Sequence, residues 1–265
     1  MSEFSIDWLD LRESSDEKAR DPKLLKLVSD SIERAGAAVV VDLGAGTGSM
    51  LRALKKRDAQ VALWRLVDHN GKSLDEALKR HMADELMEDH QADLTVIDEL
   101  PLIGATVVTA SALFDLASTD FVDGLIARLQ KQNSLIYAPL NYNGQVLWNP
   151  KHPLDEAVLE AFNEDQKRDK GMGPALGPAA SDYLADALEQ AGYEVAQAPS
   201  PWQLGSADTA LMTQLAQGVA QAITRSTELS GEQIEQWLNF RLENMKHGQC
   251  DVGHTDVLAI PKALA

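Results

Sequence analysis

The chain is poor in cysteine, in aromatic residues and in positive charge. A single cysteine, Cys250, excludes a disulfide within the chain and fits a reducing compartment. Aromatic residues make up only 5% of the 265 positions. Lys and Arg number 24 against 41 Asp and Glu, which gives a net charge of −17. Such a balance works against tight binding to nucleic-acid phosphates, so we do not expect nucleic acid as a partner.

Long apolar runs and metal-binding motifs are missing as well. No run approaches the roughly 20 apolar residues that a helix needs to cross a bilayer. Residues 1–4 contain neither the basic region nor the apolar core of a signal peptide. No H-E-x-x-H motif or Cys/His cluster is present, so we predict no metal. We therefore expect a soluble, cytoplasmic monomer or homodimer with no membrane partner. The length suits one α/β domain, residues 1–265.

An apolar run followed by three alternating glycines is the most informative segment that is present. Residues 39–43 are continuously apolar except for one acid, which is typical of a buried parallel strand. Gly44, Gly46 and Gly48 follow at once, and residues 49–55 favour a helix. Strand, glycine turn and helix N-terminus together form a site where the backbone approaches a ligand closely.

Asp42 decides which ligand this loop suits. A dinucleotide-binding loop has the pattern G-x-G-x-x-G, but here the third glycine comes one residue early and Ser49 takes its position. A carboxylate just before the first glycine would repel a diphosphate and suits a ligand that carries an ammonium group. The phosphate-binding pattern G-x-x-x-x-G-K-[ST] is absent. Residues 42–48 resemble motif I of the class I S-adenosylmethionine-dependent methyltransferases.

This resemblance implies a fold, a cofactor and a reaction. The fold is a Rossmann-like, doubly wound α/β fold, with a seven-stranded, mostly parallel sheet, helices on both faces and an antiparallel last strand. The cofactor is S-adenosylmethionine, the product is S-adenosylhomocysteine, and the methyl group passes to an O or N nucleophile of a small-molecule metabolite. In the family, this loop holds the methionine end of the cofactor. The implied contacts in the loop are Asp42, Gly44, Ala45, Gly46, Thr47 and Gly48.

Strand and helix patterns alternate along the chain, which predicts a parallel sheet with ligands at the carboxyl ends of its strands. The predicted strands are 38–43, 61–67, 93–98, 105–111 and 133–138, followed by a sixth from 192 and a last one at 253–260. The predicted helices are 48–57, 71–90, 118–131, 179–191, 206–225 and 231–246. Two capping boxes are predicted, Ser73 with Glu76 and Ser230 with Gln233.

The ends of the second and third predicted strands supply further cofactor residues. Asp68 comes where the family places an acid that accepts hydrogen bonds from the ribose hydroxyls, and His69 follows it. A carboxylate suits this role because it only accepts hydrogen bonds and can take two donors. Asp98 is the candidate for the adenine amino group, with Asp93 and Glu99 as competitors.

The end of the fourth predicted strand corresponds to the place beside the transferable methyl group. Ser111 and Asp115 are the polar residues available there; Ser111 is also a candidate cofactor contact. Asp115 is a candidate base or substrate anchor, or else it caps the following turn. The Asn/Asp-Pro-Pro-aromatic motif of amino-group methyltransferases is missing, which argues against nucleobase and glutamine acceptors. His69, His152 and His254 are candidate bases from their positions alone.

Residues 1–36 are predicted to be helical, with a helix start at Asp21 and Pro22 and an end at Gly36. Before Asp21, one tryptophan and three charged residues recur at every fourth position, so that on a helix they would share one face. This face is either a solvated ladder of salt bridges or part of a helix that folds over the cofactor. Its members are Trp8, Arg12, Asp16 and Arg20.

Residues 139–180 are predicted to be an insertion that covers the substrate, between a cofactor-binding half (37–138) and a C-terminal half (181–265). The segment is rich in Pro, Gly and Asn and contains a helix-like stretch at 154–168. Its donors and cations would suit an acidic or carbonyl-bearing substrate, and the alternative is a surface helix. The candidate substrate contacts are Asn141, Tyr142, Asn163, Arg168 and Lys170.

Three other functions remain open at this point. A nicotinamide-dependent oxidoreductase would share the strand, the glycine loop and an acid at Asp68, although Asp42 and Ser49 count against it. A non-catalytic protein could keep the fold and the cofactor pocket. Within the methyltransferases, an RNA or protein substrate would require a basic groove that forms only in three dimensions.

Overall fold

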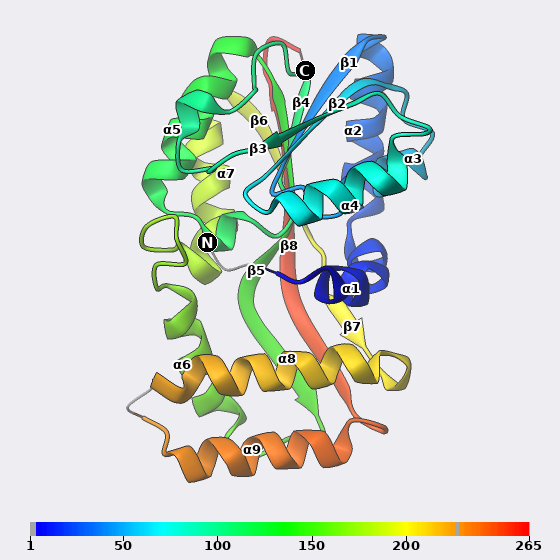
Figure 1. Cartoon of the computed structure of the whole chain (residues 1–265). Coiled ribbons are helices and arrows are strands. Elements are labelled where there is room, and N and C mark those ends of the chain that lie inside the picture. Colours follow the sequence, from blue (N-terminus) through cyan, green and yellow to red (C-terminus); the bar gives the residue numbers. More distant parts are fainter. Residues whose placement is uncertain (1–3, 226–227, 265) are drawn as a thin grey trace.

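The computed structural model describes residues 4–225 and 228–264, and these form an eight-stranded sheet (Figure 1). Its order is β3-β2-β1-β4-β5-β8-β6, with β7 paired to β8 beside this path. β8 is antiparallel to β5 and β6, while β1 to β5 pair in parallel. The strands are Ala38–Leu43 (β1), Val61–Asp68 (β2), Met87–Gln91 (β3), Val107–Thr109 (β4), Leu135–Asn149 (β5), Tyr193–Pro199 (β6), Trp202–Leu204 (β7) and Gln249–Pro261 (β8). The predicted antiparallel last strand is confirmed, and it lies between β5 and β6. Eight strands are present in the described residues where seven were predicted, because the short strand β7 also pairs with β8.

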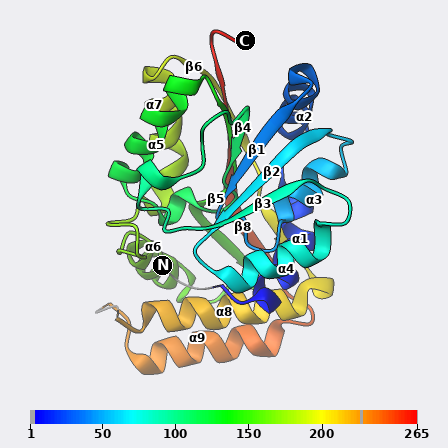
Figure 2. The ribbon, with the colours of Figure 1, turned by 45° about the horizontal axis from the view of Figure 1, so that its top comes forward.

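Helices cover both faces of the sheet, as the sequence predicted, and Figure 2 shows the two layers on either side of it. One apolar cluster joins α5 and α7 to inward residues such as Val41 and Val108, and the other joins α2, α3 and α4 to residues such as Val40 and Leu66. The helices are Ile6–Ala19 (α1), Pro22–Ala35 (α2), Ser49–Lys55 (α3), Gly71–His81 (α4), Thr119–Gln132 (α5), Asp155–Gln166 (α6), Ala180–Gln190 (α7), Thr209–Ala222 (α8) and Gly231–Asn244 (α9). Within the described ranges, no helix is both long and apolar enough to cross a membrane.

The fifth strand is much longer than the predicted strand 133–138. It continues to Asn149 and stays paired with β8 from Ile136↔Ala259 to Asn149↔Gln249, so residues 139–149 belong to the sheet. The pairing shifts register around Leu140 and Gly144, which both have positive φ. These irregularities, in a segment rich in Pro, Asn and Gly, made the strand look like a loop. The long β5–β8 ribbon carries a third apolar cluster with α6, α8 and α9 (Figure 1).

The third strand lies earlier than predicted. Residues 93–98 are not a strand: they form a turn and the start of the 3-10 helix Ile97–Glu99. The strand is β3, in the segment that was predicted to end a helix at residue 90. β3 is an edge strand that pairs only with β2 on this path, and its residues are half-buried or exposed. It therefore lacks the apolar run by which buried strands are found.

Helix ends agree with most of the capping signals. Asp21 accepts hydrogen bonds from the N–H groups of the first turn of α2, and Gly36 ends that helix at φ 70°. The capping box of Ser230 and Gln233 is confirmed at the start of α9. The predicted box at Ser73 is wrong, because Asn70 caps α4 instead.

Asp256 ties three distant parts of the chain together. Its carboxylate, on β8, accepts hydrogen bonds from the Tyr137 hydroxyl (2.8 Å) and the Leu140 N–H (2.9 Å) of β5. It also accepts one from the N–H of Asp21 (2.9 Å), between α1 and α2. Asp256 is fully buried, so these bonds offset the cost of burying a carboxylate. They fix the N-terminal helices against the centre of the sheet.

Candidate functional site

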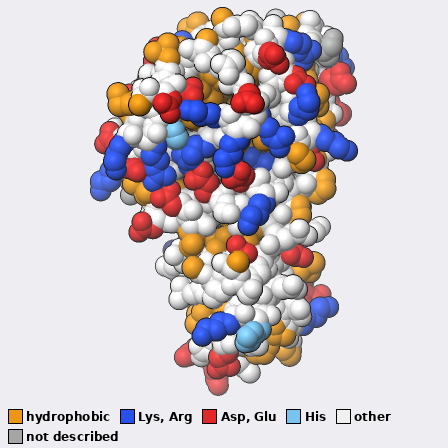
Figure 3. All heavy atoms as spheres, turned by 90° about the vertical axis from the view of Figure 1, so that its right-hand side faces the viewer, with side chains coloured by type: hydrophobic (Ala, Val, Ile, Leu, Met, Phe, Trp, Pro, Cys, Tyr) orange, Lys and Arg blue, Asp and Glu red, His pale blue; other side chains and the backbone are white. Residues whose placement is uncertain are grey.

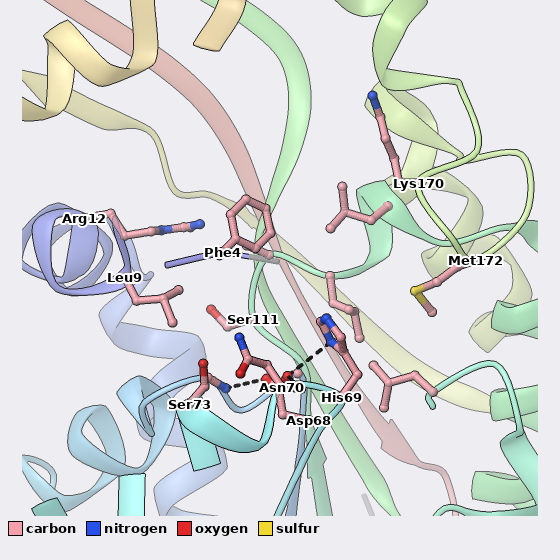
Figure 4. Close-up of a pocket in the computed structure, with 16 residues that line it drawn as sticks. Phe4, Leu9, Arg12, Asp68, His69, Asn70, Ser73, Ser111, Lys170 and Met172 are labelled. Atoms are coloured by element: carbon pink, nitrogen blue, oxygen red, sulfur yellow. Dashed lines mark hydrogen bonds and ion pairs between the residues drawn. The ribbon is translucent and has the colours of Figure 1, made fainter. Parts of the chain in front are cut away.

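A cavity opens at the carboxyl ends of β1, β2 and β4, where ligands bind in such sheets. A smaller cavity adjoins it, and the two share Leu9, Arg12, Gly44, Gly46 and Ser111. Figure 4 shows side chains of α1 facing Lys170 and Met172 across the larger cavity. The larger cavity is also lined by Phe4, Asp68, His69, Asn70, Ser73, Leu94, Ala112, Leu113, Leu116, Lys170 and Met172. The smaller one adds Asp16, Asp42, Ala45, Thr47 and Ser49.

The glycine loop turns sharply beneath this cavity. Gly44, Gly46 and Gly48 have φ of 67°, 54° and 83°, a region that L side chains rarely adopt. The N–H of Gly44 donates to the carbonyl of Val67 (2.8 Å), and the N–H of Gly46 donates to Oδ2 of Asp68 (2.8 Å). Asp68 therefore shapes the loop while keeping acceptor capacity for a ligand, because a carboxylate has about four lone-pair sites.

Asp42 lies buried at the base of the smaller cavity. The hydroxyl of Thr109 donates to its Oδ1 at 2.6 Å. Burial raises the pKa of Asp42 to about 7, although the Thr109 hydrogen bond and the charge of Arg20 act in the opposite direction. A carboxyl group in this state gains from a cationic group placed beside it.

The helix α1 closes one side of both cavities. Asp16, on this helix, accepts two hydrogen bonds from Arg12 (2.9 and 3.2 Å) and one from Nε1 of Trp202 (2.9 Å). Asp16 and Arg20 are only 5% and 3% exposed. The hypothesis of a solvated ladder is therefore wrong: the four-residue repeat marks a face that packs against the sheet and lines the cavities.

Arg20 is a buried cation beside the smaller cavity. Its Nη2 donates to the hydroxyls of Ser49 (3.1 Å) and Ser111 (3.3 Å), and both serines line that cavity. Its Nε has no hydrogen-bond partner in residues 4–225 and 228–264, and no carboxylate there forms an ion pair with Arg20. Burying a charge is costly unless it is paired, so this guanidinium favours an anion nearby.

Ion pairs fasten the outer face of α1 to the neighbouring helices. Asp10 pairs with Arg80 of α4 (2.7 Å), while Glu13 pairs with Arg52 of α3. Glu17 adds a third pair with Lys56 (2.5 Å), just after α3. Figure 3 shows Lys and Arg side chains gathered on this side of the molecule among Asp and Glu. The cations named here are thus matched by acids of α1.

The structure gathers most of the predicted cofactor residues around the two cavities. The exceptions are Gly48 and Asp98. Gly48 lies behind the loop, where an added Cβ would lie 3.3 Å from the ring of His81. Asp98 is exposed on the 3-10 helix that replaces the predicted strand and lines neither cavity. Leu94 lines the larger cavity instead, directly after Asp93, an exposed acid whose Oδ1 accepts hydrogen bonds from Thr95.

Some of the predicted catalytic and substrate residues line the cavities, and the others lie outside them. Ser111 and Lys170 line the cavities, with Lys170 paired to Asp165 (2.6 Å). Asp115 is buried next to them, in the 3-10 helix Phe114–Leu116. The other four lie outside both cavities. The side-chain amide of Asn141 is hydrogen-bonded to the backbone of Phe114, Ala138 and Thr255. The hydroxyl of Tyr142 donates to Asn163 (2.8 Å). Arg168 lies in a surface groove beside α6.

Sequence reasoning missed the apolar lining of the larger cavity. Phe4 and Leu9 come from the N-terminal segment, and Met172 comes from the segment before α7. The four-residue repeat on α1 was the available signal for this side, but it identified the polar neighbours only. Within the described part of the chain, no group of three or more His, Cys, Asp or Glu side chains is placed to hold a metal ion.

Comparison with known proteins supports the fold. No protein-family model matches the sequence, and a search of curated proteins gave no match.

A cyclopropane-fatty-acyl-phospholipid synthase-like protein from Lactobacillus casei has a TM-score of 0.55 at 13% identity, over 94% of this chain and 98% of its own. A candidate methyltransferase from Bacillus halodurans gives 0.50 and 13%, over 87% and 96%. An S-adenosylmethionine-dependent methyltransferase from Thiobacillus denitrificans, in complex with S-adenosylhomocysteine, gives 0.49 and 16%, over 98% and 100%. With its sheet order and antiparallel β8, the chain has the class I S-adenosylmethionine-dependent methyltransferase fold.

Proposed function

We propose that the protein binds S-adenosylmethionine and transfers its methyl group to a small-molecule acceptor. The observation that carries this proposal is the pairing of opposite charges around the smaller cavity. Arg12, which is paired with Asp16, and the buried Asp42 both line this cavity, and Arg20 lies beside it, bonded to the lining residues Ser49 and Ser111. Such a cavity is complementary to an amino-acid zwitterion, which the methionine end of the cofactor carries. A dinucleotide has no such group.

The larger cavity suits the adenosine part of the cofactor. Asp68 offers acceptors to the ribose hydroxyls, and His69 lies beside it. Leu94, Leu113 and Met172 supply apolar walls for the base. We propose Asp93 as the acid that meets the adenine amino group, in place of Asp98, because it directly precedes Leu94.

The protein's contribution to the reaction is orientation and exclusion of water. The cofactor supplies an activated methyl group on its sulfonium sulfur. Ser111, held by Arg20 and shared by both cavities, would lie at the junction of the cofactor's two ends. We propose that α1 and the segment around Lys170 cover the bound molecules. A cavity enclosed by these segments suits a small acceptor. The net charge of −17 on the chain disfavours a nucleic acid as the acceptor.

Calorimetric titration with S-adenosylmethionine, S-adenosylhomocysteine and NADH tests this function. Binding of the first two alone is expected. Binding of NADH alone would support the nicotinamide-dependent alternative and contradict our interpretation of Asp42. Binding of the cofactor without turnover of any metabolite would favour a non-catalytic binding protein. If none of the three ligands bound, the enzyme hypothesis would lose its main support.

Replacing Asp68 by Ala should weaken S-adenosylhomocysteine binding by about 1–3 kcal/mol, because charged hydrogen bonds to ribose are lost. The substitution also frees the N–H groups of Gly46 and Asn70, to which Asp68 is bonded. Asp89→Ala, which removes an exposed acid on the neighbouring strand β3, is the matched control and should bind as the wild type does. Unchanged affinity in the Asp68 variant would remove this residue from the cofactor site.

A further inference from the structure

Buried polar atoms without partners gather behind the face of α1 that lines the cavities. They are Nε1 of Trp8, Oδ1 of Asp115 and Nδ1 of His254, and none has a hydrogen-bond partner in the described residues. The side chains of Asp115 and His254 belong to residues only 9% and 6% exposed. Buried polar groups are nearly always hydrogen-bonded in folded proteins, so a group of exceptions needs a cause.

Arg12 connects these residues in space. Burial raises the pKa of Asp115 and lowers that of His254, and the positive charge of Arg12 acts to lower both, so the guanidinium lies near each group. Arg12 also lies 5.0 Å from the ring centre of Trp202, and that ring lies 5.0 Å from the ring of His254. Because Arg12 lines both cavities, the group of polar atoms adjoins the proposed cofactor site.

Tyr142 of β5 lies opposite His254 of β8, to which it is paired in the sheet. Its ring centre lies 6.4 Å from that of His254 and 5.7 Å from that of Phe162. Its hydroxyl is occupied by the hydrogen bond to Asn163. Oδ1 of Asp115 is the free acceptor of this region, because it is buried and has no hydrogen-bond partner in the described residues.

The charges of these groups limit what could bind between them. Burial raises the pKa of Asp115 to about 6, so this carboxyl is mostly ionised at neutral pH. Burial lowers the pKa of His254 to about 4, so its imidazole is neutral. An ionised Oδ1 needs a hydrogen-bond donor and repels an anion, while Arg12 repels a cation. A neutral donor satisfies both groups.

We propose that this region binds the methyl acceptor and that the acceptor presents an uncharged hydroxyl group to Oδ1 of Asp115. The inference rests on the proposed function, because the methyl donor is S-adenosylmethionine. Nδ1 of His254 and Nε1 of Trp8 are then available to other polar atoms of the same molecule. The product is a methyl ether.

The proposed step balances without any further reactant. The hydroxyl oxygen attacks the methyl carbon of the sulfonium, a C–O bond forms, and the C–S bond breaks. The electron pair of that bond stays on sulfur, which leaves neutral S-adenosylhomocysteine. The hydroxyl proton passes to the Asp115 carboxylate, which acts as the general base and later returns the proton to solvent.

The test uses S-adenosylmethionine labelled in its methyl group, together with the small-molecule fraction of an extract from the cells that encode the protein. The wild type should place the label in a compound that resists mild alkali and releases labelled methyl iodide in hot hydriodic acid, as expected for a methyl ether. A label that mild alkali releases as methanol would indicate an ester, and a label that resists both reagents would indicate a methyl group on nitrogen, sulfur or carbon. Either result would overturn the hydroxyl proposal.

Asp115→Asn should lower the labelling rate by about 100-fold or more, the usual contribution of a general base. It should leave S-adenosylhomocysteine affinity unchanged, which also verifies that the variant folds. Asp120→Asn, an exposed acid on α5, is the matched control and should label as the wild type does. In the wild type, kcat/KM should fall as the pH drops through about 6, because protonation of Asp115 removes the base.

Several outcomes separate this inference from the proposed function. If the wild type does not bind S-adenosylmethionine, the function itself fails. If it binds the cofactor but labels nothing, methyl transfer itself fails and the non-catalytic alternative is favoured. If the wild type labels a compound and Asp115→Asn labels it at the same rate, the acceptor site is wrong while the cofactor site and the proposed function stand. A parallel loss of cofactor affinity in Asp115→Asn would likewise contradict the proposed role, because it would point to a structural carboxyl.

Discussion

Gly46→Val should reduce S-adenosylmethionine affinity by more than about 100-fold, which corresponds to about 2.7 kcal/mol. Gly46 has a φ of 54°, and a Cβ there would lie 3.1 Å from Cδ1 of Leu9. A branched side chain would therefore strain the loop and push against α1 while it fills space at the junction of the two cavities. Calorimetric titration with S-adenosylmethionine measures the effect directly.

Gly36→Val provides the control for backbone strain alone. Gly36 has a similar φ of 70°, but an added Cβ there would meet nothing within 4 Å. This variant should lose stability in a thermal melt and keep its affinity for the ligand. Retained affinity in Gly46→Val would contradict the assignment of the loop to the cofactor. Equal loss of affinity in both variants would mean that general destabilisation is the cause.

Arg20→Met should lower the affinity for S-adenosylhomocysteine by about 10-fold to 100-fold, since hydrogen bonds to charged groups contribute about 1.5–3 kcal/mol. The affinity for 5′-methylthioadenosine should hardly change, because that compound lacks the amino-acid group. In the wild type, S-adenosylhomocysteine should be the tighter ligand of the two. The comparison isolates the smaller cavity from the adenosine site, which both compounds would occupy.

The matched control is Arg34→Met. Arg34 is exposed at the end of α2, far along the chain from the cavity residues of α1, and donates hydrogen bonds to Asp30 and Ser31 of its own helix. It should affect neither ligand. An equal loss for both ligands in Arg20→Met would show that Arg20 stabilises the glycine loop through Ser49 and does not attract the carboxylate.

The elements with continuous apolar runs could be predicted from the sequence. β1 and β2 lie where the runs predicted them, because strands covered on both faces need apolar residues at every position. The glycine loop follows directly, and Asp68 takes its place at the end of β2. β3 could not be predicted in the same way, because it is an exposed edge whose polar residues resemble a helix surface. The third strand was therefore expected to end at residue 98, whereas β3 ends at Gln91, two residues before Asp93.

Long-range contacts account for the rest of what was missed. The polar repeat on α1 has the same pattern whether it faces solvent or the sheet, and only tertiary packing brings Trp202 to Asp16. Asn141 looks like a substrate contact in the sequence, because nothing local reveals that Phe114, Ala138 and Thr255 use its amide. Periodicity describes a residue's neighbours along the chain and does not identify its partners across the fold.

The position of β8 has a consequence for biosynthesis. This strand, Gln249–Pro261, inserts between β5 and β6, and it carries both His254 and Asp256. Until these residues have left the ribosome, the edges of β5 and β6 that pair with β8 stay open in the nascent chain. The chain also lacks His254, a member of the proposed acceptor site. Contacts between segments so far apart in sequence form slowly and leave strand edges open to aggregation. A chain that ends before residue 249 should therefore expose the edges of β5 and β6 and aggregate more readily than the full chain.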